Sequence, residues 1–106
     1  MLFDEGWERS LKIQGCAIID VRNANELAEA SAVFGALHLP CPMAADPASV
    51  ISEAVEGLDK AKPVVVYCAV GGRSARVVVA LRLAGFAAAV NGGSRDNVAE
   101  KMAQMA

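Results

Sequence analysis

The sequence is poor in cysteine and histidine and has no long apolar run, and each shortage excludes a class of protein. Three cysteines among 106 residues cannot all pair within one chain, which argues against a disulfide scaffold and for a reducing compartment, the cytoplasm. No apolar segment approaches the ~20 residues of a membrane span, and the N-terminus shows no signal-peptide pattern. With one histidine and scattered cysteines, we expect neither a metal site nor a cofactor.

Charge is small in total but uneven along the chain. Twelve acids and ten bases give a net charge of −2, which argues against binding to nucleic acid or to a membrane surface. Residues 1–62 carry ten acids and five bases, whereas residues 63–95 carry four arginines and no acid. A basic segment within an acidic chain is typical of an anion-binding site, although solvated arginines on a helix would give the same pattern.

Length and hydrophobic content predict one domain over residues 1–106 with a packed core, since 55% of the residues are hydrophobic. Strands are expected at residues 16–21, 63–68 and 87–90, with a very short one at 36–39, and helices at residues 23–32, 47–58, 74–84 and 94–105. Because strands alternate with helices, the sequence predicts an α/β fold with a parallel sheet covered on both faces.

The best candidate for chemistry is the segment that follows the strand at residues 63–68. Cys68 ends this strand, and Gly71 and Gly72 allow the backbone to curl so that successive N–H groups point inward. The start of the next helix and the charge of Arg73 add positive potential. Together these groups predict a lowered pKa for the Cys68 thiol and an anion-binding loop, whereas the alternative is a buried, inert core cysteine.

The residues around Cys68 resemble a motif of a known protein family. Tyr67-Cys68-x-x-Gly71-x-Arg73-Ser74 is similar to the active-site loop of single-domain rhodaneses, which are sulfurtransferases. Three other stretches resemble family motifs in the same order: I-I-D-V-R at residues 18–22, G-A-L-H-L-P at residues 35–40, and L-x-x-x-G-F followed by N-G-G within residues 81–93. The resemblance covers roughly residues 16–98.

The resemblance implies a rhodanese-like fold, with a mostly parallel five-stranded sheet and helices on both faces. It implies transfer of sulfur from a small anionic donor such as thiosulfate to cyanide or a thiol, through a persulfide on the catalytic residue Cys68. Arg73 is expected to bind the sulfonate of the donor, or in part to brace the loop. Asp20 and Arg22 lie just past a strand end, and the resemblance places them near the loop. An ion pair that supports the loop is favoured for them over a direct catalytic role. The remaining substrate-binding residues implied are Ala69, Val70, Gly71, Gly72 and Ser74.

Two other functions compete with this interpretation. In the first, the domain is a persulfide carrier or regulatory module that delivers sulfur to an acceptor protein and uses small donors poorly. In the second, it is a phosphatase or arsenate reductase. The second is disfavoured because only residues 69–72 separate Cys68 from Arg73, one residue fewer than in those enzymes.

Four further residues carry weaker expectations. Cys41 could approach Cys68 as a resolving thiol, but an incidental cysteine is favoured, and Cys16 is expected to be buried and inert. His38 is expected at a strand end rather than as a general base. Arg95 follows the last glycine pair and either lines the mouth of the site or is solvated.

Overall fold

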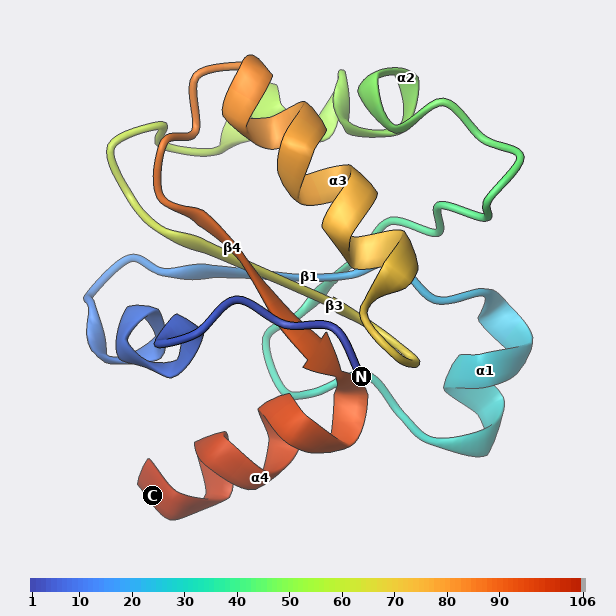
Figure 1. Cartoon of the computed structure of the whole chain (residues 1–106), viewed down its shortest axis with the longest axis vertical. Helices are drawn as coiled ribbons and strands as arrows, with labels where there is room; N and C mark the ends of the chain where they lie inside the picture. Colours follow the sequence, from blue (N-terminus) through green and yellow to red (C-terminus); the bar gives the residue numbers. More distant parts are fainter. Residues whose placement is uncertain (106) are drawn as a thin grey trace.

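The strands of the chain form one parallel sheet, seen edge-on near the centre of Figure 1. The computed structural model describes residues 1–105. Their strands are β1 (Ala17–Asp20), β2 (Leu37–His38), β3 (Val64–Cys68) and β4 (Ala89–Ser94), in the order β2-β1-β3-β4. Every neighbouring pair is parallel, so all four strands end at the same edge of the sheet.

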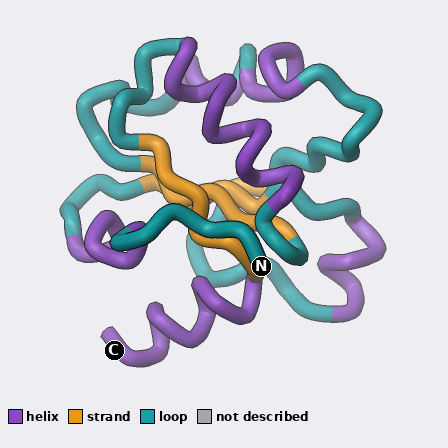
Figure 2. Tube along the Cα trace, in the orientation of Figure 1, coloured by secondary structure: helices purple, strands orange, loops and turns teal. Residues whose placement is uncertain are grey.

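Helices cover both faces of this sheet, as the sequence predicts (Figure 2). They are α1 (Ala24–Glu29), α2 (Pro47–Ile51), α3 (Gly72–Leu83) and α4 (Arg95–Met105), with 3₁₀ helices η1 (Trp7–Lys12) and η2 (Ala54–Gly57). Side chains of α2 and α3 pack against one face of the sheet, and Trp7 of η1 and Val98 of α4 pack against the other. Among the described residues, no helix combines the length and the apolar character needed to cross a membrane.

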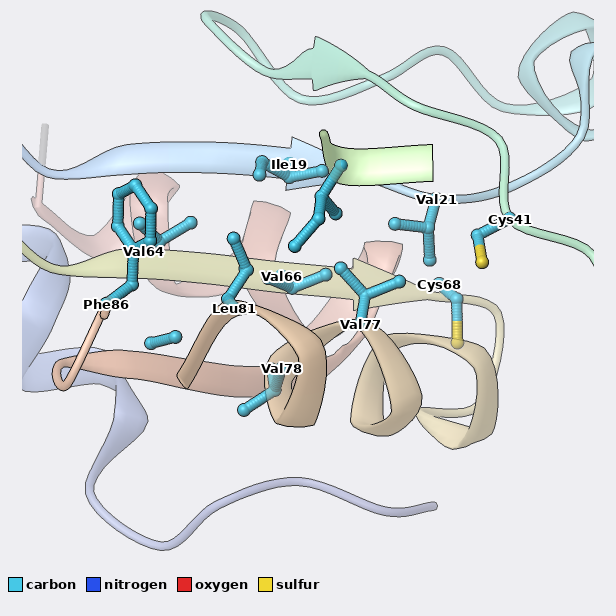
Figure 3. Close-up of a cluster of buried hydrophobic side chains, with 12 residues drawn as sticks. Ile19, Val21, Cys41, Val64, Val66, Cys68, Val77, Val78, Leu81 and Phe86 are labelled. Atoms are coloured by element: carbon cyan, nitrogen blue, oxygen red, sulfur yellow. The ribbon is translucent and has the colours of Figure 1, made fainter. Parts of the chain in front are cut away.

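The position of β3 in the sheet explains why its sequence is apolar without alternation. Val64 and Val66 point into the cluster beneath α3, where they meet Val77 and Leu81 (Figure 3), whereas Val65 and Tyr67 point into the cluster beneath α4. Because both faces of this central strand are buried, successive side chains on opposite sides are all apolar or aromatic.

The expectation of five strands is wrong for the described residues, which form four. Residues 1–4 instead lie along the outer edge of β4. Leu2 N–H donates to the Val70 carbonyl, and Asp4 N–H donates to the Asn91 carbonyl, both at 2.8 Å. One bond goes to the loop after β3 and the other to β4, so no repeating ladder forms and the segment is not a strand.

Most other boundaries differ from the prediction by one to three residues, and two differ by more. The helix expected at residues 47–58 is broken after Ile51, where the Ser52 hydroxyl donates to the Ser49 carbonyl at 2.9 Å, and such side-chain bonds compete with helix continuation. The last strand, expected at residues 87–90, extends past Val90 through Gly92 and Gly93 to Ser94. It does so with a register irregularity opposite Val66 and Tyr67.

Substitution of Gly92 tests the packing of β4 against α4 and β3. A Cβ atom at this position would lie 2.8 Å from Val98 Cγ2 and 2.9 Å from Val65 Cγ1. We therefore expect Gly92→Ala to lower the free energy of unfolding by about 1–3 kcal/mol, as overpacked core substitutions do. Chemical denaturation measures the change.

The matched control is Gly57→Ala, because a Cβ atom there meets nothing within 4 Å. Its free energy of unfolding should stay close to that of the native protein. An equal loss in both variants would contradict the packing described for β4.

Candidate active site

The sulfur of Cys68 lies at the C-terminal end of β3, under the loop that leads into α3 (Figure 3). The side chain is fully buried. Gly71 N–H donates to Cys68 Sγ at 3.0 Å, and the Ser74 hydroxyl oxygen lies 3.4 Å from the same sulfur. The loop curls back in this way because Gly71 has φ +96°, a left-handed conformation that other residues rarely adopt.

This environment favours ionisation of Cys68. Burial alone would raise the pKa of its thiol, but hydrogen bonds from the Ser74 hydroxyl and from the loop and helix amides, including Gly71 N–H, outweigh burial and lower it. Burial raises the pKa of both Cys16 and Cys41. Since the thiolate is the nucleophilic form, Cys68 is the cysteine best suited to react.

Arg73 points toward α1 and forms an ion pair with Glu26. Its two terminal nitrogens donate to Glu26 Oε1 and Oε2 at 2.6 and 2.9 Å, and this pairing lowers the pKa of Glu26 to about 2. The role expected of Arg73, binding of the donor sulfonate, stays a prediction. In this structure its charge is balanced by a carboxylate.

Glu26 is a site residue that the sequence reasoning missed. Its Oε1 also accepts the N–H of Asn23 at 2.9 Å, in the capping box that starts α1. The signal was present, because Asn followed three residues later by Glu is the pattern of a capping box. The pattern places a carboxylate on the first turn of a helix that begins beside the ends of β1 and β3.

The expected ion pair between Asp20 and Arg22 is present and buried. Arg22 Nη2 lies 2.9 Å from Asp20 Oδ2, and the Tyr67 hydroxyl donates to the same oxygen at 2.6 Å. Burial opposes ionisation of Asp20, but the bonds from Arg22 and Tyr67 prevail and lower its pKa. Burial and the bond to Asp20 raise the pKa of Tyr67 to about 12. Tyr67 directly precedes Cys68, so the pair is linked through Tyr67 to the strand end that carries the cysteine, and the loop-supporting role expected of Asp20 and Arg22 stays a prediction.

The other loop residues differ in their exposure. Ala69 and Val70 are exposed on the outside of the loop, Gly72 is the first residue of α3, and Ser74 is buried beneath it. Ala69 borders a pocket of about 220 Å³ whose walls also include Arg95, which places this arginine beside the loop.

Cys41, Cys16 and His38 complete the comparison with the sequence. Cys41 is buried in the same hydrophobic cluster as Cys68 (Figure 3), and Cys16 is half-buried. His38 lies at the end of β2, where its Nε2 is 2.6 Å from the Arg22 carbonyl oxygen, so it occupies the strand-end position expected of it. Within residues 1–105, no group of three or more His, Cys, Asp or Glu residues could hold a metal ion.

Comparisons with known proteins place these features in a family. Residues 5–99 match the family model described as "Rhodanese-like domain". The SSP1007 protein of Staphylococcus saprophyticus is 30% identical, with a TM-score of 0.61 over 84% of this chain and 81% of that one. A rhodanese-like domain protein from Staphylococcus aureus is 26% identical, with a TM-score of 0.60 over 82% of this chain and 78% of that one.

A third solved structure supports the fold alone. The rhodanese-like domain of the Alr3790 protein from Anabaena sp. is 24% identical, with a TM-score of 0.62 over 96% of this chain and 94% of that one. No protein among those with curated descriptions matches the sequence significantly. The structural similarity confirms the rhodanese-like fold expected from the sequence.

The loop geometry makes Gly71→Ala a sharp test. A Cβ atom there would lie 1.9 Å from the Leu2 carbonyl oxygen, and the left-handed backbone adds strain. We expect a loss of unfolding free energy of at least about 1–2 kcal/mol, the conformational penalty before any clash. Urea denaturation measures this loss.

Gly72→Ala is the matched control for this variant, because its Cβ atom meets nothing within 4 Å and the residue is helical. It should be as stable as the native protein or slightly more stable, since alanine favours helix over glycine. Equal stability of the two variants would contradict the loop conformation.

The ion pair between Glu26 and Arg73 predicts a pH dependence of stability. The pKa of Glu26 is lowered from 4.5 to about 2 in the folded protein, so the pair contributes fully above pH 4.5 and is lost as the pH falls toward 2. The stability advantage of the native protein over Glu26→Gln should therefore shrink across this interval.

Thermal unfolding at a series of pH values measures the difference, with Glu29→Gln, an exposed carboxylate of the same helix, as the control. The difference in stability between the native protein and Glu29→Gln should change less with pH than the difference between the native protein and Glu26→Gln. A constant advantage over Glu26→Gln across the interval would show that the ion pair contributes nothing.

Proposed function

Because the chain belongs to the rhodanese-like domain family, we propose that it is a sulfurtransferase that carries sulfur as a persulfide on Cys68. The observation that supports this proposal most directly is the bond from Gly71 N–H to Cys68 Sγ, 3.0 Å long, in a loop that lowers the pKa of the thiol. A sulfur anion is what this loop is built to hold.

The proposed reaction has two displacement steps. In the first, the Cys68 thiolate attacks the outer sulfur of thiosulfate, the sulfur–sulfur bond of the donor breaks, and sulfite leaves with its electron pair. In the second, cyanide or a thiolate attacks the outer sulfur of the persulfide, and the Cys68 thiolate leaves. Each step is the displacement of one anion by another at a sulfur atom, so neither needs a general base or an external oxidant.

Loop length favours sulfur over phosphate or arsenate chemistry. Residues 69–72 separate Cys68 from Arg73, and the Gly71 amide already lies within hydrogen-bond distance of the sulfur. A loop closed so tightly on one sulfur atom leaves little space for a tetrahedral oxyanion above it. This argument supports the sulfurtransferase proposal against the phosphatase alternative.

The pairing of Arg73 with Glu26 supports a second candidate function, a persulfide carrier. Glu26 neutralises the guanidinium that would attract a divalent donor such as thiosulfate, and side chains of both residues are less than a quarter exposed. A site without a free positive charge suits a thiol-bound or protein-bound sulfur donor. In this alternative the persulfide still forms on Cys68, but small anionic donors react slowly.

Mass spectrometry after incubation with a sulfur donor tests the persulfide. We expect the native protein to gain about 32 Da, one sulfur atom on one thiolate, and Cys68→Ala to gain nothing. Cys41→Ala is the matched control, because it removes a second buried cysteine whose pKa is raised by burial, and it should gain the same mass as the native protein.

Thiocyanate production from thiosulfate and cyanide separates the two candidates. Rapid turnover supports the enzyme, whereas a persulfide that forms with a thiol-bound donor and turns over slowly with thiosulfate supports the carrier. A folded Cys68→Ala variant that keeps the adduct or the turnover would disprove both.

A further inference from the structure

Asn91 is a buried polar residue of β4 that the reaction described above does not use. Its side chain makes three hydrogen bonds around the cysteine loop. Oδ1 accepts from the Ser74 hydroxyl at 2.7 Å and from Gly93 N–H at 3.0 Å, and Nδ2 donates to the Gly71 carbonyl at 3.0 Å. Asn91 therefore joins β4 to the loop and to the first turn of α3.

Two backbone groups fix which way the Asn91 amide points. The N–H of Gly93 can only donate and the carbonyl of Gly71 can only accept. The amide oxygen must therefore face Gly93, and the amide nitrogen must face Gly71. This orientation turns the oxygen toward Ser74, so the Ser74 hydroxyl is the donor of that bond.

The consequence reaches Cys68 because a hydroxyl group has a single proton. While Ser74 donates to Asn91, its oxygen lies 3.4 Å from Cys68 Sγ and can only accept the proton of the thiol. We propose that Asn91 is a positioning residue that holds the Ser74 proton away from the sulfur while Cys68 is a thiol. The inference rests on the proposed function, since it deepens the account of the same cysteine.

Each state of the sulfur then has its own hydrogen-bond arrangement. When the thiol ionises, its proton leaves to solvent and the Ser74 hydroxyl turns from Asn91 Oδ1 to the sulfur, so one bond breaks and one forms. In a persulfide the negative charge lies on the outer sulfur, and Ser74 can stay with Asn91. Asn91 thus competes with the thiolate for the Ser74 proton, whereas it does not destabilise the thiol or the persulfide. A thiolate that is less strongly hydrogen-bonded is a stronger nucleophile.

The charged groups that surround Cys68 in the native protein are kept in every variant of the test, and Asn91→Asp adds one carboxylate. Arg73 of α3 lies beside the loop with Glu26 of α1 as its partner, and Cys41 shares the hydrophobic cluster of Cys68. The buried pair of Asp20 and Arg22 lies below Tyr67 at the end of β1. In a background with Cys16→Ala and Cys41→Ala, the thiolate absorbance in the ultraviolet follows Cys68 alone.

The test measures how far Ser74→Ala moves the midpoint of this titration in three backgrounds. Leucine at position 91 removes the acceptor that competes for the Ser74 proton, and aspartate is a stronger acceptor. We expect the upward shift caused by Ser74→Ala to be largest with Asn91→Leu, intermediate with Asn91 and smallest with Asn91→Asp. The shift in the Asn91→Leu background should exceed the shift with native Asn91 by about one pH unit, the scale of one charge-assisted hydrogen bond.

Effects of Asn91 on the loop alone cancel in this comparison, because they are present with and without Ser74. Asn97→Leu is the matched control. Asn97 lies in α4, and its Nδ2 donates to the carbonyl of Gly92 in β4 at 2.7 Å, but its side chain does not bind Ser74. Equal shifts in all backgrounds, or the reverse order, would overturn the inference. If Asn91→Leu fails to fold, the comparison of Asn91 with Asn91→Asp decides alone.

The titration involves no sulfur donor, so its outcome is separate from that of the proposed function. A protein that forms no persulfide can still show the expected order of shifts, which would leave the inference standing and reject the function. A protein that forms the persulfide but shows equal shifts in every background would support the proposed function and reject the inference about Asn91.

Discussion

A sulfur anion buried at the end of a strand must be surrounded by hydrogen-bond donors, and this constraint shapes the whole region around Cys68. The side chain has no exposed surface, so water cannot stabilise a charge on the sulfur. The donors come from the backbone instead, which requires the chain to reverse within three residues and start a helix. Gly71 permits that reversal through its left-handed conformation, and its N–H reaches the sulfur at 3.0 Å.

The same constraint explains how the neighbouring charges are arranged. A buried charge without a partner is costly, and the buried or partly buried charged side chains Asp20, Arg22, Glu26 and Arg73 beside the loop are all paired. Asp20 is held by Arg22 and by the Tyr67 hydroxyl, and Arg73 is held by Glu26. These pairs connect α1 and the end of β1 to the two sides of the cysteine loop. The local positive potential therefore comes mainly from backbone N–H groups rather than from a free arginine.

The sequence predicted the parts of the site that depend on local order along the chain. An apolar strand followed by Cys68, two glycines and a helix was enough to place the cysteine at the sheet edge, and the Asp20–Arg22 pair followed from its position at another strand end. The capping-box pattern could have placed Glu26 on α1, but its pairing with Arg73 and the bond of Asn91 to Ser74 depend on contacts 47 and 17 residues away in the sequence. Such contacts are set by helix orientation and strand register, which no local pattern specifies.

The strand β4 shows why register matters more than residue type at this site. The glycines after Val90 continue the strand, and position 92 must be glycine because a Cβ atom there would collide with Val98 and Val65. That continuation places the Asn91 side chain under the loop. Its backbone groups remain on the outer edge, where they bind Asp4.

Residues 1–4 hold the same loop from outside, since Leu2 N–H donates to the Val70 carbonyl. The loop is thus fixed between the N-terminal segment and β4, two parts of the chain that are far from it in sequence. These contacts order the loop without any ligand, so the N–H groups need little reorganisation when charge develops on the sulfur.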